Sequence, residues 1–114
     1  MRRRTLKLDA RDWSRQIAAI AADSRHARAE VRFLTSELAG RPPRHRLNGI
    51  AYDHGSKQLQ VAVREDGPQS PEVRYLVSAP REITVEEFDH ATGIVVEDAS
   101  GVRTLIWLYA DVTH

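Results

Sequence analysis

LNGIAYDHGSKQLQVAVR, residues 47–64, is the stretch that decides the fold of this chain. Two runs rich in aliphatic residues flank the turn sequence Asp53-His54-Gly55-Ser56. Gly55 can take a positive φ without steric cost, and the Asp53 carboxylate can accept hydrogen bonds from the turn backbone. After the turn, apolar and polar residues alternate with the period of a half-buried strand, with the apolar positions at Leu59, Val61 and Val63. The stretch therefore predicts a β-hairpin.

The composition predicts one folded domain. The chain has 114 residues, of which 41% are hydrophobic and 29% charged, an ordinary balance for a globular protein. We expect a single domain over 1–114, with a basic N-terminal extension at 1–4, loops at 35–46 and 65–72, and a tail at 110–114. The chain has no cysteine, which excludes disulfides, thiolate nucleophiles and thiolate zinc sites.

The segment before the hairpin predicts a short strand over Thr5–Leu8 and then a helix over about Ala10–Asp23. Asp9 is a suitable N-cap for that helix, because its carboxylate can accept from the exposed N–H groups of the first turn. One apolar stripe follows at helical spacing, at Trp13, Ile17, Ile20 and Ala21. The helix is therefore amphipathic.

The segments around the hairpin predict further strands. They are Ala29–Leu34, Val73–Val77 with a continuation through Ile83 and Val85, and a last hairpin of Ile94–Glu97 and Val102–Tyr109. The final strand is apolar on both faces, which is typical of a central strand. Strands without intervening helices indicate an antiparallel sheet. The predicted class is α+β, with the N-terminal helix packed on five or six antiparallel strands that can curl into a partial barrel.

Several short motifs occur in an order that resembles a known family. They are the early Trp13 in a helix, the Gly49-x-x-Tyr52-Asp53 hairpin, a Pro80-Arg81-x-Ile83 segment, and a closing hairpin with Gly101-x-Arg103. In this order the chain resembles a family of small uncharacterised bacterial proteins catalogued as a domain of unknown function. The resemblance covers most of the chain between Leu8 and Leu108. It implies a shared fold and no particular activity.

Motifs of catalysis and of metal binding are missing from the sequence. No two of the five histidines stand at i, i+2 or i, i+4, and there is no nucleophile elbow or phosphate-binding glycine run. The pair Asp53-His54 is better explained as part of a turn than as a histidine base polarised by an aspartate. Glu86-Glu87-Phe88-Asp89-His90 reads as an acidic connection, because the spacing of a calcium loop is absent. We therefore expect no catalytic residues, no metal and no cofactor.

One basic loop is the strongest candidate for a binding site in the sequence. Arg41, Arg44, His45 and Arg46 surround two prolines, and their guanidinium groups could bind phosphates or carboxylates. The same residues could simply form a solvated loop, the commoner role of such charge runs. Residues 1–46 carry 12 Lys/Arg against 5 Asp/Glu, and residues 47–114 carry 5 against 11. These charges could form one basic and one acidic face, but we expect them to be scattered over the surface, because the segments of one sheet intermix in space.

These observations favour a non-enzymatic interaction or regulatory module. Its partner would be another protein or a second copy, reached through a sheet edge or through the opposed charges. One alternative is nucleic-acid or polyanion binding through the basic N-terminal half. Another is a small enzyme or ligand binder whose site, around Asp53, His54 or Glu82, is assembled only in the fold. With no apolar run of membrane-spanning length, we expect a cytoplasmic protein without a membrane contact.

Overall fold

A computed structural model of the chain describes residues 4–24, 27–33, 45–65, 71–89 and 91–109. Within these ranges the chain forms eight strands, one α-helix and a short 3-10 helix. In chain order they are β1 (Arg4–Lys7), η1 (Ala10–Asp12), α1 (Trp13–Asp23), β2 (Arg28–Phe33), β3 (His45–Asp53), β4 (Gln58–Glu65), β5 (Glu72–Ser78), β6 (Pro80–Glu87), β7 (Ala91–Asp98) and β8 (Arg103–Tyr109).

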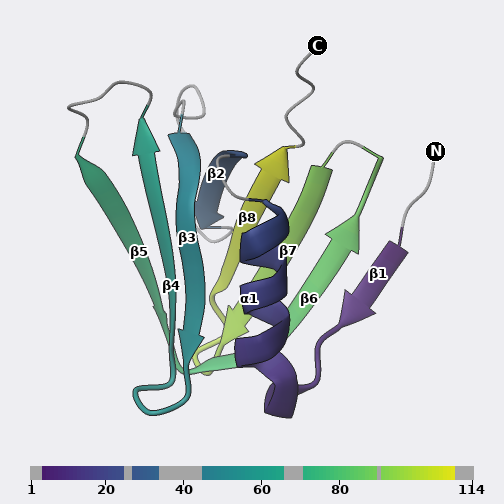
Figure 1. The fold of residues 1–114 in the computed structure, drawn as a ribbon. Coiled ribbons are helices and arrows are strands. Elements are labelled where there is room, and N and C mark those ends of the chain that lie inside the picture. The colour runs from purple at the N-terminus through teal and green to yellow at the C-terminus, as the bar shows by residue number, and fades with distance from the viewer. Residues whose placement is uncertain (1–3, 25–26, 34–44, 66–70, 90, 110–114) are drawn as a thin grey trace.

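The strands form one antiparallel sheet in the order β1-β6-β7-β8-β2-β3-β4-β5, and Figure 1 shows that this sheet is strongly curled. We call strands β3, β4 and β5 the β3–β5 half, and β6, β7 and β8 the β6–β8 half. Strand β2 joins them, because it pairs along β8 and meets β3 through Arg28 opposite Arg46 and Ala29 opposite His45. Strands β1 and β5 stand at the two ends of the order, so the sheet curls without closing.

The hydrophobic core lies between the facing sides of the two halves. In each half, alternate residues of the strands point inward, as the period of a strand requires. The fully buried side chains come from both halves and from α1, and they include Leu47, Leu59, Val61 and Val63 on one side, Ile83, Ile94, Val96 and Ile106 on the other, and Ile17 from the helix. The α+β class and the helix packed on an antiparallel sheet are thus confirmed.

Helix α1 packs against the curled sheet through the predicted stripe. Trp13 and Ile17 are buried, and Ile20 and Ala21 pack against the same core. The predicted helix over Ala10–Asp23 divides into η1 and α1, because its first turn is a 3-10 turn. The Asp9 carboxylate caps η1 by accepting a hydrogen bond of 3.0 Å from the backbone N–H of Arg11, whereas the N-cap of α1 is Asp12, which makes no side-chain cap bond. The helix lies beside β3 in Figure 1.

Helix α1 also supplies a hydrogen-bond donor to a backbone carbonyl of β3. The Ser14 hydroxyl donates to the backbone carbonyl of Tyr52 at 3.1 Å, and the Trp13 ring meets the Tyr52 ring edge-on at 5.2 Å between centroids. A strand carbonyl that has no ladder partner must find another donor when it is partly buried. The helix supplies that donor on the side of β3 away from β4.

The central hairpin forms as predicted, with one difference in its turn. Asp53 accepts from the backbone N–H of Gly55 at 3.1 Å and from the Ser56 hydroxyl at 2.8 Å, and these bonds hold the pKa of its carboxyl below the ordinary value. The positive φ expected at Gly55 is wrong, because it falls instead on Lys57 at 53°. The Asp53 side chain binds the Gly55 N–H and the Ser56 hydroxyl, and the positive φ falls two residues after Gly55.

The described residues form eight strands, whereas five or six were expected in the sheet after the helix, because the apolar pattern hides the break between β5 and β6. The short strand predicted over Thr5–Leu8 is β1, and it joins the same sheet. Ala79 has a φ of 50°, which turns the chain between β5 and β6. Strand β5 then pairs with β4, and β6 pairs with β7 and β1. At the N-terminal end, Arg4 belongs to β1 rather than to an extension, and His45 and Arg46 belong to β3 rather than to the loop.

Candidate interaction edge and adjoining groove

Strand β5 is one of the two end strands of the sheet, and its surface is unusually apolar. Leu76 is 54% exposed and Val73 is 38% exposed, two of the three large hydrophobic residues exposed in the described part of the chain. Natural edge strands usually carry lysine, proline or an inward-pointing charge, which disfavour pairing with another strand. The seven residues of β5 contain neither lysine nor proline, and the two charged residues, Glu72 and Arg74, lie on the outer face with Leu76.

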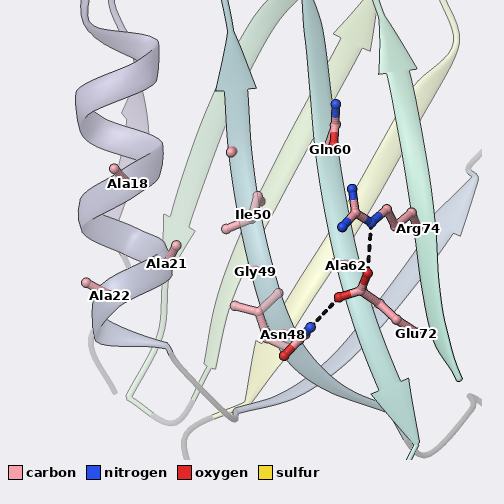
Figure 2. A pocket seen from close by; sticks show the side chains of 12 residues that line it. Ala18, Ala21, Ala22, Asn48, Gly49, Ile50, Gln60, Ala62, Glu72 and Arg74 are labelled. Carbon is pink, nitrogen blue, oxygen red and sulfur yellow. Dashed lines mark hydrogen bonds and ion pairs between the residues drawn. The ribbon is translucent and has the colours of Figure 1, made fainter. Parts of the chain in front are cut away.

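A groove adjoins this edge on the outer side of the β3–β5 half (Figure 2). Its volume is about 430 Å³, within the range of small-ligand sites. One wall is α1 and the other is the outer face of the three strands. Small residues form much of its surface, namely Ala18, Ala21, Ala22, Gly49, Ala51 and Ala62, and we call it the alanine groove.

Four polar residues, Asn48, Gln60, Glu72 and Arg74, also line the alanine groove. The register of β3 against β4 shifts between Leu47 and Gly49, which leaves Asn48 as the extra residue of a bulge. The Asn48 amide donates to one Glu72 carboxylate oxygen, and Arg74 Nε donates to the other at 2.8 Å. Figure 2 shows these three side chains in one chain of contacts along the sheet.

The neighbours of Glu72 determine the pKa of its carboxyl group. The hydrogen bonds from Arg74 and Asn48, with the charges of Arg74 and Arg64 nearby, hold the pKa of the Glu72 carboxyl below its ordinary value. Glu72 is therefore ionised at neutral pH and fixes the orientation of the Arg74 guanidinium. The side chain of Arg74 remains 62% exposed.

The predicted polyanion site is only partly described. Arg41 and Arg44 lie outside the described residues, and His45 is described only as a residue of β3. Arg46 stands on β3 opposite Arg28 of β2 and opposite Arg64 of β4. We call Arg28, Arg46 and Arg64 the arginine row, since the register places them at matching positions on three adjacent strands.

The charge asymmetry between the two ends of the sequence is partly cancelled in the fold. Basic β1 pairs with acidic β6, and Lys7 Nζ lies 3.9 Å from Glu82. On the outer side of the β6–β8 half, Glu97 accepts from Arg81 Nη2 at 2.6 Å and from Arg103 Nε at 3.3 Å, which lowers the pKa of its carboxyl. The expectation that segments of opposite charge interleave is met at this edge.

The residues considered for a fold-assembled enzyme site do not converge. Glu82 lines a second groove of about 310 Å³ on the outer side of the β6–β8 half, together with Glu86, Glu97 and Arg103. Asp53 and His54 lie in the exposed turn between β3 and β4, and neither lines that groove or the alanine groove. Among the described residues, no group of three or more histidine, aspartate or glutamate side chains is placed to hold a metal ion.

Sequence reasoning missed the residues that the fold brings together here. Glu72 fell at the end of a predicted loop, and Asn48 fell in a strand whose bulge the pattern does not show. One signal was present, because Glu72, Arg74 and Leu76 alternate with the apolar residues of β5 and so share its outer face. Leu76 stands on this outer face, two residues after Arg74, and its exposure distinguishes β5 from an ordinary edge strand.

No protein-family model, curated protein or solved structure matches this chain. In the described part of the chain, none of the helices has the length and apolar character needed to cross a membrane.

Proposed function

We propose that this protein is a non-enzymatic interaction module that pairs with a second copy of itself along β5. The observation that carries the proposal is the exposed, apolar β5 at the end of the sheet, with Leu76 more than half exposed. Strand addition at a sheet edge supplies main-chain hydrogen bonds together with side-chain contacts on both faces. Such an interface fits a binding role without requiring any catalytic group.

The sequence of β5 is suited to pairing with itself. In an antiparallel arrangement with a two-fold axis at Tyr75, all seven residues overlap, and Val73 faces Val77 of the second copy. On the other face, Arg74 lies opposite Leu76 of the second copy, so its aliphatic stem covers the exposed leucine. Glu72 faces Ser78, and no like charges oppose each other across the new ladder.

The expected dimer is of moderate affinity. A seven-residue strand is roughly 23 Å long, and its pairing buries less surface than the roughly 800 Å² per partner of a standard stable interface. We therefore expect a concentration-dependent equilibrium between monomer and dimer. The dimer would carry one continuous sheet across the two copies.

The test compares one substitution on each end strand. Light scattering on a size-exclusion column, over a series of protein concentrations, should show the mass rising from one chain to two. Leu76→Lys should weaken dimerisation by about tenfold or more, because a lysine on an edge strand opposes pairing. Thr5→Lys on β1 is the matched control and should leave the dimerisation unchanged. A monomer at every concentration, or equal loss in both variants, contradicts the proposal.

The arginine row favours a second candidate function, the binding of a polyanion such as nucleic acid. The register places these three arginines at matching positions on adjacent strands, and guanidinium groups in a row can each bind a phosphate of a polyanion. Fluorescence anisotropy with labelled single-stranded RNA and duplex DNA, at low and at physiological salt, tests this. Binding should fall steeply with salt and should be lost in the Arg46→Ala/Arg64→Ala variant but not in Arg103→Ala. Absence of binding at low salt retires this candidate.

A further inference from the structure

The alanine groove combines a fixed cation with an apolar surface, which is the combination that a small organic acid requires. Arg74 comes from β5 at one side of the groove, and the alanines of α1 lie at the other, as Figure 2 shows. Small-molecule sites are lined mostly by apolar groups, with a few polar groups that set the orientation of the ligand. Asn48 and Gln60 add amide groups to the same lining.

The hydrogen bond between Arg74 and Glu72 uses Nε of Arg74 and not its terminal nitrogens. Glu72 accepts from Nε of Arg74 at 2.8 Å, and Glu72 is itself held by the amide of Asn48. A guanidinium held through Nε keeps its two terminal N–H groups in a planar fork, which matches the two oxygens of a carboxylate. The bulge at Asn48 thus positions Glu72, and Glu72 positions Arg74.

The charges in the lining distinguish between classes of anion. Among the described residues that line the groove, Arg74 is the one cation and Glu72 the one anion, and Glu72 is ionised beside Arg74. Each further negative charge on a ligand adds repulsion from the Glu72 carboxylate, which favours a monoanion over a dianionic phosphate. The alanine side chains offer surface to an aliphatic body and no further charge.

We propose that the alanine groove binds a small aliphatic carboxylate, with its carboxyl group on the terminal nitrogens of Arg74 and its hydrocarbon chain along the alanines of α1 and β4. Binding does not require pairing along β5, because every lining residue belongs to one chain, although Arg74 on β5 is shared with the proposed interface. Gln60 lies beside Arg74 in Figure 2 and can donate to the same carboxyl group.

The test uses hexanoate as the probe in a protein-observed NMR titration. Hexanoate should shift the amide signals of the groove residues saturably. Hexanamide, which has the same chain without the charge, should bind at least about tenfold more weakly, since a hydrogen bond to an ionised group is worth that much. Acetate, which has the same charge on a shorter chain, should also bind at least about tenfold more weakly, because it lacks the methylene groups that would pack on the alanines. Equal binding of either control, or no saturable shift at tens of millimolar, overturns the proposal.

Two variants locate the site on the protein. Arg74→Gln should weaken hexanoate binding by about tenfold, whereas Arg103→Gln should leave it unchanged. Arg103 is a matched control, because its Nε also donates to a glutamate, Glu97, in the other half of the sheet. Ala62→Leu should block the groove without changing a charge, with circular dichroism confirming that the variant folds. Unchanged binding in both Arg74→Gln and Ala62→Leu contradicts the assignment.

Discussion

The β3–β5 half and the β6–β8 half are alike inside and differ at their ends. The inner faces of both halves are mostly aliphatic and are buried over most of their strands, although Val73 on β5 is 38% exposed. The end strand β5 exposes Leu76 and Val73, whereas β1, the end strand on the other side, exposes Arg4, Thr5 and Lys7, with Lys7 paired to Glu82. Charge at an edge stays hydrated and opposes strand addition, whereas apolar surface favours it. The comparison teaches that burial dictates the inner faces and leaves the two edges free to take different roles.

The largest expected effect tests whether the two inner faces are equivalent. Leu59→Ala on β4 and Ile83→Ala on β6 each empty a fully buried position. Each should lower the free energy of unfolding by about 2–5 kcal/mol, because both remove apolar contacts and leave a cavity. Urea denaturation should show one cooperative transition in each variant. Two separate transitions in either variant would mean that the halves do not share a single core.

A smaller effect compares glycines on the two outer faces. A Cβ at Gly93 of β7 would lie 3.2 Å from the Trp107 ring, whereas a Cβ at Gly49 of β3 would meet no atom within 4 Å. Gly49→Ala should stabilise the protein by about 0.4–1 kcal/mol, because it restricts the unfolded chain. Gly93→Ala should lose that gain by displacing Trp107, which packs against Phe88 at 5.4 Å.

Thermal unfolding followed by tryptophan fluorescence measures this pair. Gly93→Ala should also alter the native emission, since Trp107 is the ring that moves, while Gly49→Ala should leave the emission unchanged. If the two alanine variants have the same melting temperature, the outer faces are packed more alike than the structure indicates.

The smallest effect concerns the carboxylates of the two outer faces, Glu72 and Glu97. The hydrogen bond from Arg74 lowers the pKa of Glu72, and that from Arg81 lowers the pKa of Glu97, below the ordinary value of 4.5. Because the folded-state pKa is depressed, each carboxylate contributes stability that is fully present above pH 4.5 and is lost as the pH falls below it. The contributions are small, since both ion pairs lie at the surface and their arginine partners, Arg74 and Arg81, are exposed.

Urea midpoints between neutral pH and pH 3 provide the measurement. Glu97→Gln should flatten the acid side of the profile more than Glu72→Gln, because Glu97 has two arginine partners and Glu72 has one. A profile that both variants leave unchanged would show that neither network contributes to stability.

The part of the fold governed by local periodicity could be predicted from the sequence. Helix α1, the Asp9 cap of the η1 turn before it, the central hairpin and the buried inner residues of the strands follow from apolar spacing and turn chemistry. The break at Ala79 could not be predicted, because alternation runs on through it while the backbone turns. The candidate site was missed for a related reason, since Asn48, Glu72 and Arg74 meet through a bulge and a strand register that no local pattern encodes.

The sequence by itself thus determined the class of fold, the helix face that is buried and the inner face of most strands, because each depends on the spacing of neighbouring residues. Only the tertiary structure decided which strands stand at the ends of the sheet, which polar groups meet, and where the alanines of α1 face the strands. These features depend on pairing between segments far apart in the chain. The free energy of such pairing is set by the whole sheet and not by the residues of any single strand.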